Sequence, residues 1–248
     1  MSETFLYATL GGFISFVSTA AGALLSFSRL KGFKLFRFKF SIDFALGLML
    51  SAVAFSLVGP TTAQVLNKPF LLMINILGFI LGGAIIYLLK GIIERYQRSN
   101  LTSSTQLLLA LALIVHNFPE GMASGAAMAG LDTSASSSIL LSISLQNIPE
   151  GLLMVLCLKS MGWSQQRALI GGLASGGVEL LGGIGSGVAL SFIQNALPVL
   201  LMIAGGAMFT SVAIELKEKG KILSHVRKPE FAMGVLTIPA LNSALMIF

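Results

Sequence analysis

The chain has 248 residues, of which 55% are hydrophobic and only 10% are charged, against about 25% charged residues in an ordinary soluble domain. Its mean hydropathy of +0.88 is too high for one water-soluble core. This excludes a cytosolic enzyme and, despite the net charge of +6, a nucleic-acid-binding module. The single cysteine, Cys157, excludes a disulfide framework and a thiolate zinc site. Lipid is therefore the expected solvent for most of the chain.

Eight apolar runs are long enough to cross a hydrocarbon core of about 30 Å, which takes roughly 20 helical residues. In chain order they cover residues 5–28, 41–60, 69–93, 105–129, 136–159, 167–192, 196–216 and 231–248. The loops between them, about 15 residues at most, are too short to hold a soluble domain. The sequence therefore predicts an all-α polytopic membrane protein, with residues 1–248 forming a single transmembrane domain.

The basic residues lie almost entirely in alternate loops. Fifteen of the 16 Lys and Arg residues lie in or at the edges of the loops after the first, third, fifth and seventh runs, and only Lys68 lies between the second and third. Because cytoplasmic loops carry the excess of Lys and Arg, these four loops are expected in the cytoplasm and both termini outside. The expected location is a bacterial inner membrane.

A short motif occurs in both the fourth and the fifth run. Residues 116–122 read His-Asn-Phe-Pro-Glu-Gly-Met, and residues 146–152 read Gln-Asn-Ile-Pro-Glu-Gly-Leu. In a helix, the first and fifth positions of each copy stack on one face: His116 with Glu120, and Gln146 with Glu150. The two copies lie at nearly equal depth, so we expect them to face each other across an antiparallel helix pair. Gly121 and Gly151 are expected to let a neighbouring helix approach closely.

Three carboxylates lie near the middle of apolar runs: Glu120, Glu150 and Glu179. Each ionised residue at that depth costs about 2.5 to 3.5 kcal/mol on insertion scales. No Lys or Arg lies at the same depth, which leaves a metal ion or a proton as the expected partner. Imidazole, carboxylate and amide oxygen together suit a borderline divalent metal such as zinc, iron(II) or manganese, and two opposed glutamates could bridge two such ions.

With this doubled motif, the sequence resembles the ZIP family of divalent metal transporters. The resemblance implies eight transmembrane helices in a 3+2+3 arrangement and import of metal toward the cytosol. It implies a first metal site at Met49, His116, Glu120, Gln146 and Glu150. It implies a second metal site at Asn117, Glu120, Asn147, Glu150 and Glu179. Many family members have histidine where Gln146 stands and some have aspartate where Asn147 stands, so the metal site is more neutral in this chain.

The expected function is transport of zinc, with tolerance for iron(II), manganese or cadmium. The metal is then the substrate, no cofactor is needed, and the chain is not an enzyme. An intramembrane metal-dependent hydrolase would use the same carboxylates, but the His-Glu-x-x-His pattern and a separate general base are absent from the sequence. A metal-selective channel would use the same residues, and only flux kinetics distinguishes it from a carrier. The expected partners are divalent metal ions and the lipid bilayer, and a homodimer is one oligomeric state left open.

Overall fold

The structure is a computed structural model, and it describes residues 3–27, 42–99, 105–193, 196–218 and 227–245. Each of the eight predicted runs corresponds to helix. Seven are single helices: α1 (Glu3–Leu25), α4 (Pro69–Ser99), α5 (Thr105–Gly130), α6 (Thr133–Ser160), α7 (Gln165–Phe192), α8 (Leu197–Glu218) and α10 (Pro229–Leu245). The second run differs from expectation because it is built from three consecutive segments: α2 (Ile42–Ala52), the π-helix η2 (Val53–Val58) and α3 (Gly59–Val65).

Most of these helices have the length and composition of membrane spans. Within the described part of the chain, six segments are long and apolar enough to cross a bilayer: 3–25, 46–65, 69–92, 133–160, 165–192 and 197–217. A shorter apolar helix covers Pro229–Leu241. Large apolar side chains are exposed along α4, among them Phe70, Ile80 and Leu88, as expected of a surface in contact with lipid. The protein is therefore an all-helical polytopic membrane protein.

Short turns make α5, α6 and α7 antiparallel neighbours. Asp132 caps α6, because its Oδ1 accepts a hydrogen bond from the backbone N–H of Ala135 at 3.0 Å. Between α6 and α7, Gly162 has a φ of +86°, a conformation that glycine adopts without a steric cost. Ser164 then caps α7 by accepting from the N–H of Arg167 at 3.4 Å. These turns bring polar residues from three helices to a similar depth.

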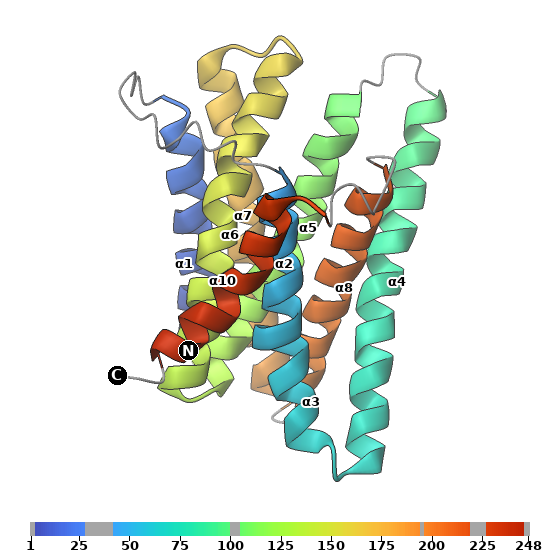
Figure 1. The fold of residues 1–248 in the computed structure, drawn as a ribbon, viewed down its shortest axis with the longest axis vertical. Helices are drawn as coiled ribbons and strands as arrows, with labels where there is room; N and C mark the ends of the chain where they lie inside the picture. The colour runs from blue at the N-terminus through green and yellow to red at the C-terminus, as the bar shows by residue number, and fades with distance from the viewer. Residues whose placement is uncertain (1–2, 28–41, 100–104, 194–195, 219–226, 246–248) are drawn as a thin grey trace.

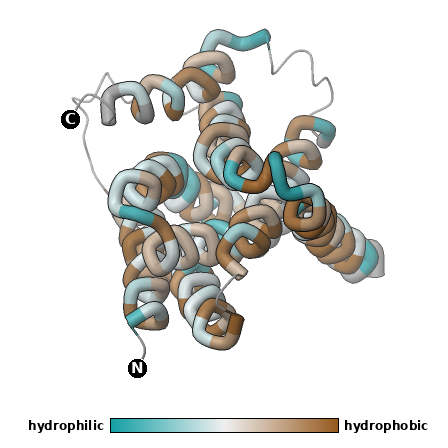
Figure 2. The backbone as a smooth tube through the Cα atoms, turned by 90° about the horizontal axis from the view of Figure 1, so that it is seen from below, coloured by the Kyte–Doolittle hydropathy of each residue, from teal (hydrophilic) through white to brown (hydrophobic). Residues whose placement is uncertain are grey.

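The helices pack in two sets. In the first set, α1, α5, α6 and α7 each contact the other three. In the second, α2 packs against α10 and α4 packs against α8 (Figure 1). Contacts of α5 with α8 and of α2 with α6 join the two sets. Seen from below, most helices point toward the viewer, and apolar and neutral residues predominate over the hydrophilic ones (Figure 2).

Glycines bring helix backbones together within the first set. A Cβ atom added to Gly121 of α5 would collide with the backbone carbonyl of Glu179 on α7. A Cβ atom on Gly151 of α6 would collide with the backbone carbonyl of Thr19 on α1. The expected close approach at both glycines is confirmed, and it places the backbones beside the two motif copies in direct contact.

The described basic residues gather at one end of the bundle. The turns from α3 to α4 and from α5 to α6 lie toward the lower end of Figure 1, where α1 also begins and α10 ends. Within the described residues, Lys68 belongs to this end. The other Lys and Arg residues with described side chains lie toward the opposite end, in or beside the ends of α4, α6, α7, α8 and α10: Lys90, Arg95, Lys159, Arg167, Lys217, Arg227 and Lys228.

Candidate metal site

The two motif copies meet where α5 faces α6. The side-chain amide of Gln146 donates a hydrogen bond to Glu120, with 2.5 Å between Nε2 and Oε1. Both side chains are completely buried. The first position of one copy thus touches the fifth position of the other, as an antiparallel pair with helical periodicity allows. The expectation that the copies face each other is confirmed.

Glu179 extends this polar cluster from α7. Its Oε1 accepts a hydrogen bond from the Thr19 hydroxyl at 2.5 Å, and its Oε2 accepts one from Asn147 Nδ2 at 3.0 Å. Asn147 Nδ2 also donates to the Ser15 hydroxyl at 2.9 Å. The sequence alone suggested only a metal ion or a proton as the partner of Glu179. The structure adds hydroxyl and amide donors, as a buried carboxylate requires.

Asn117 is held in a similar way from the other motif copy. Its Nδ2 atom donates to both the backbone carbonyl and the hydroxyl of Ser175 on α7, at 3.0 and 2.9 Å. Asn117 and Asn147 occupy the same position in the repeat, and the amide nitrogen of each is bonded to α7. Helices α5, α6 and α7 are therefore joined by hydrogen bonds between their side chains.

Three amide oxygens in this cluster accept no hydrogen bond from any residue that the structure describes: Asn117 Oδ1, Gln146 Oε1 and Asn147 Oδ1. Each side chain is at most 1% exposed. A buried acceptor left in this state costs about 1 to 3 kcal/mol, which a bound cation would offset. Because the nitrogen atoms of these amides already donate hydrogen bonds, the oxygen atoms are the groups that the three amides can offer to a cation.

The negative charge of the cluster comes from three carboxylates. Glu120, Glu150 and Glu179 are at most 5% exposed and lie close enough to interact electrostatically. Ionised together they carry a charge of −3, which one divalent ion changes to −1 and two change to +1. Carboxylate and amide oxygens at membrane depth suit a divalent cation better than an uncharged solute.

Two residues predicted for the site stand apart from these contacts. His116 belongs to α5, one turn before Glu120, but its side chain lies outside the described residues. Met49 is buried in an apolar cluster of α2, α8 and α10, together with Val212, Leu216 and Phe231. Its role as a metal ligand stays a prediction.

A metal centre made only of His, Cys, Asp and Glu is not formed by the described side chains. Among them, no group of three such residues is arranged to hold one ion. The polar cluster differs from such a centre because three of the side chains that could bind a metal are amides: Asn117, Gln146 and Asn147. The imidazole of His116, one turn from Glu120, is not among the described side chains.

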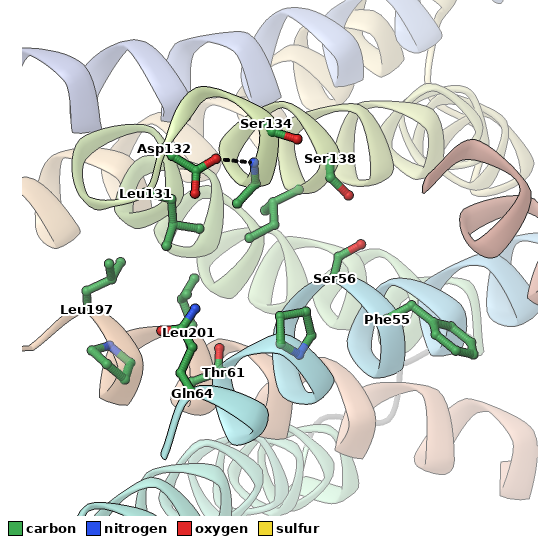
Figure 3. A pocket seen from close by; sticks show the side chains of 14 residues that line it. Phe55, Ser56, Thr61, Gln64, Leu131, Asp132, Ser134, Ser138, Leu197 and Leu201 are labelled. Carbon is green, nitrogen blue, oxygen red and sulfur yellow. Dashed lines mark hydrogen bonds between the residues drawn. The ribbon is translucent and has the colours of Figure 1, made fainter. Parts of the chain in front are cut away.

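A pocket of about 350 Å³ lies at the end of the bundle that holds the α5–α6 turn. Figure 3 shows Ser56 of η2 and Ser138 of α6 on facing walls, with Asp132 farther along the pocket beside Leu131 and Ser134. One turn deeper on α6, Ser142 shares a 3.0 Å hydrogen bond with Ser56. Gln146 follows after one more turn, so hydroxyl groups on one face of α6 connect the pocket with the polar cluster.

The sequence did not single out Ser15, Thr19 or Ser175. Ser15 and Thr19 are four residues apart, as are Ser175 and Glu179, so each pair shares one helix face. That spacing was available as a signal. It is weak because serine and threonine are common at helix contacts in membranes.

A protein-family model described as ZIP Zinc transporter matches residues 91–216, a range that contains both motif copies and Glu179. The zinc transporter ZIPB of Bordetella bronchiseptica is 33% identical over 234 residues, covering 84% of this chain and 71% of that protein. The zinc transporter GufA of Myxococcus xanthus is 41% identical over 113 residues, covering 46% of this chain and 44% of GufA. The human zinc transporter ZIP11 is 27% identical over 146 residues, covering 56% and 43% of the two chains.

These similarities agree with the buried, doubled motif and with the membrane-spanning helices. The family model covers half of the chain, and the match with ZIPB extends over most of both proteins. The chain therefore belongs to the ZIP family of zinc transporters.

Proposed function

We propose that this protein carries zinc across the membrane into the cytosol, through a metal site centred on α5 and α6. The observation that carries this proposal is the buried cluster around Glu120 and Gln146, where carboxylates lie beside amide oxygens that accept no hydrogen bond from the described residues. Zinc is the proposed substrate because the relatives are named zinc transporters. Iron(II), manganese and cadmium are proposed as weaker substrates of the same site, because its imidazole, carboxylate and amide ligands suit several divalent transition metals.

The proposed site has two halves that share Glu120 and Glu150. The first half takes His116 and Gln146, with Met49 of α2. The second half takes Asn117, Asn147 and Glu179. The charge of the three carboxylates is compatible with either one or two divalent ions. The hydrogen bonds of Asn147 and Asn117 support the second half, because they leave the amide oxygens available for a metal.

The proposed path begins at the pocket beside the α5–α6 turn. Asp132 and the hydroxyls of Ser56 and Ser138 line it, and these oxygen atoms can replace part of the hydration shell of an incoming cation. The hydrogen bond between Ser56 and Ser142 lies between this pocket and Gln146. Metal would pass these hydroxyls and then exchange its remaining water for carboxylate and amide oxygen.

The proposed topology has eight crossings, three before and three after the central pair α5–α6. Both termini lie outside the cell, and the basic end of the bundle lies in the cytoplasm of a bacterium with this protein in its inner membrane. The gathering of described Lys and Arg residues at one end supports this orientation. With it, the pocket faces outward and transport runs inward. A homodimer is proposed as the assembly, with one complete path in each copy.

Uptake by the purified full-length chain in liposomes tests the proposal. Zinc, iron(II), manganese, cadmium and magnesium are offered outside liposomes that contain a metal-sensitive dye. We expect saturable zinc uptake that exceeds the leak of empty liposomes, slower uptake of the other transition metals, and no uptake of magnesium. Equal rates for all five metals, or no zinc uptake at all, would contradict the proposal.

Two other functions were compatible with the same carboxylates. Membership of a transporter family favours transport over a metal-dependent hydrolase. A channel is distinguished from a carrier by the uptake rates, because a carrier saturates at a turnover rate whereas a channel need not. We expect saturation, because the site binds its ion through several buried ligands.

A further inference from the structure

Helix α1 carries no part of the repeated motif, yet it contributes two hydroxyl groups to the polar cluster. Ser15 and Thr19 are both 1% exposed and lie on one face of α1. Glycines fix this helix in place: a Cβ on Gly12 would crowd the backbone of Gly183 on α7, and one on Gly22 would collide with the Ile148 carbonyl on α6. The two hydroxyls therefore have a defined position relative to α6 and α7.

The Glu179 carboxylate, held by Thr19, selects which way the Asn147 amide points, and Ser15 adds a second acceptor for the amide nitrogen. Its nitrogen has two N–H groups, and they donate to Ser15 Oγ at 2.9 Å and to Glu179 Oε2 at 3.0 Å. Thr19 donates a hydrogen bond to the other oxygen of Glu179. This bond holds the carboxylate in the position where it accepts the hydrogen bond from Asn147. If the amide were reversed, its oxygen would face the carboxylate oxygen, and two acceptors would repel each other. The amide oxygen is thus directed away from α1 and accepts no hydrogen bond from the described residues.

We propose that Ser15 and Thr19 are positioning residues of the metal site, because they hold Asn147 and Glu179 so that the amide oxygen of Asn147 is presented to the metal. Neither hydroxyl touches the metal in this arrangement. The inference rests on the proposed function, since it assigns to α1 a part in the zinc site that the repeated motif does not contain. Loss of either hydroxyl should weaken metal binding without disturbing the helix packing.

The test measures zinc affinity of the full-length protein in detergent by competition with a zinc-binding dye. Ser15→Ala and Thr19→Val each remove one hydroxyl, and valine keeps the branched shape that contacts Gly176. We expect each to weaken zinc binding at least about tenfold, the usual loss when a residue that orients a metal ligand is removed. Thr19→Ser keeps the hydroxyl and should restore most of the affinity. Ser18→Ala is the matched control, because Ser18 bonds only to the Ile14 carbonyl of its own helix in the described contacts.

A second pair of variants separates positioning from packing. Asn147→Asp replaces the amide with a carboxylate, which presents an oxygen in either orientation. In the Asn147→Asp protein, Ser15→Ala should weaken zinc binding by less than about twofold. The effects of the two substitutions on zinc affinity should therefore be strongly non-additive. The thermal unfolding midpoint of the metal-free protein should be the same with and without Ser15→Ala.

Three outcomes would overturn the inference. The first is unchanged zinc affinity in both Ser15→Ala and Thr19→Val while the parent protein binds zinc, which leaves the proposed function standing. The second is an equal loss of zinc affinity when Ser15→Ala is made in the parent protein and in the Asn147→Asp protein, which would assign Ser15 to helix packing alone. The third is a parent protein that neither binds nor transports zinc, in which case the proposed function fails as well.

Discussion

At the scale of single residues, Gln146 occupies the polar position at which the two motif copies differ. The first position of the other copy is His116, whereas Gln146 donates its amide N–H to Glu120 and its Oε1 accepts no hydrogen bond within the described residues. A neutral amide oxygen is a weak, hard ligand, and an imidazole nitrogen suits zinc better. Gln146 is thus the position at which a single change should alter the choice of metal.

Gln146→His should tighten zinc binding relative to manganese by about tenfold, or roughly 1.4 kcal/mol. We expect a lower half-saturation concentration for uptake with an unchanged or lower maximal rate, because a tightly held ion leaves slowly. Binding should also weaken more steeply as the pH falls, since a second imidazole must lose its proton before it coordinates. Zinc and manganese affinities of both proteins, measured at several pH values, check this. An unchanged zinc-to-manganese ratio and pH dependence would remove Gln146 from the metal ligands.

The residues of the cluster were only partly predictable. Glu120, Glu150 and their partners could be identified because a carboxylate at membrane depth is costly and the motif is repeated. The spacing of Ser15 and Thr19 was too weak a signal to identify them, because hydroxyl groups can also satisfy their hydrogen bonds within their own helix, as Ser18 does here. Which hydroxyl faces the site depends on the orientation of α1 about its own axis relative to α6 and α7. That orientation cannot be predicted from the sequence of α1 alone.

At the scale of elements, the approach of α5 to α7 depends on glycine. Gly121 follows Glu120 directly, and its Cα lies against the backbone of Glu179. This contact brings carboxylates from two helices together, so the separation of the helices is part of the site. By contrast, a Cβ on Gly177 of α7 would meet nothing within 4 Å.

Gly121→Ala should lower the stability of the protein in detergent by about 1 to 3 kcal/mol or more, because the added methyl group must push two backbones apart. Gly177→Ala is the matched control, and it should leave stability unchanged or raise it, since alanine is the better helix former by about 1 kcal/mol. Thermal unfolding of both variants against the parent protein measures the difference. If both variants unfold at the same temperature, close packing at Gly121 is not what holds α5 against α7.

Helix positions could be predicted from the sequence because each apolar run has the length of a bilayer crossing. The division of the second run into α2, η2 and α3 could not. Pro60 lacks the N–H that would continue regular bonding, and the N–H of Gly59 bonds to the carbonyl of Ala54, five residues earlier. Both α and π geometry keep the run helical and apolar, so hydrophobic periodicity does not distinguish them.

At the scale of the whole molecule, the charge pattern defines two ends but the sequence does not define which helices group together. Short turns predict that α5 lies next to α6 and α6 next to α7. The placement of α1 among α5, α6 and α7, and of α2 beside α10, joins segments far apart in the chain. These contacts depend on glycines that let two backbones approach closely. For example, a Cβ atom on Gly47 of α2 would collide with the backbone carbonyl of Phe231 on α10.

The orientation is tested by labelling single cysteines in intact cells. In a Cys157→Ala background, Asn67→Cys and Gln166→Cys each place one thiol at an exposed position, at opposite ends of the bundle. We expect a membrane-impermeant maleimide to label position 67 in intact cells and position 166 only after permeabilisation, because the basic end should face the cytoplasm. The reverse result would place the pocket inside and would contradict import.

Zinc uptake by carboxylate variants tests the central claim most directly. Glu120→Gln and Glu150→Gln are reconstituted in liposomes beside the parent protein, with Glu3→Gln as the control because Glu3 is exposed at the start of α1. Both buried variants should fold normally, since removing a buried charge does not weaken the helix contacts. Their zinc uptake should fall at least about tenfold, because even residues behind a metal ligand cost about 10- to 100-fold when removed. If either variant carries zinc at the rate of the parent and the Glu3→Gln protein, zinc does not pass through the site on α5 and α6.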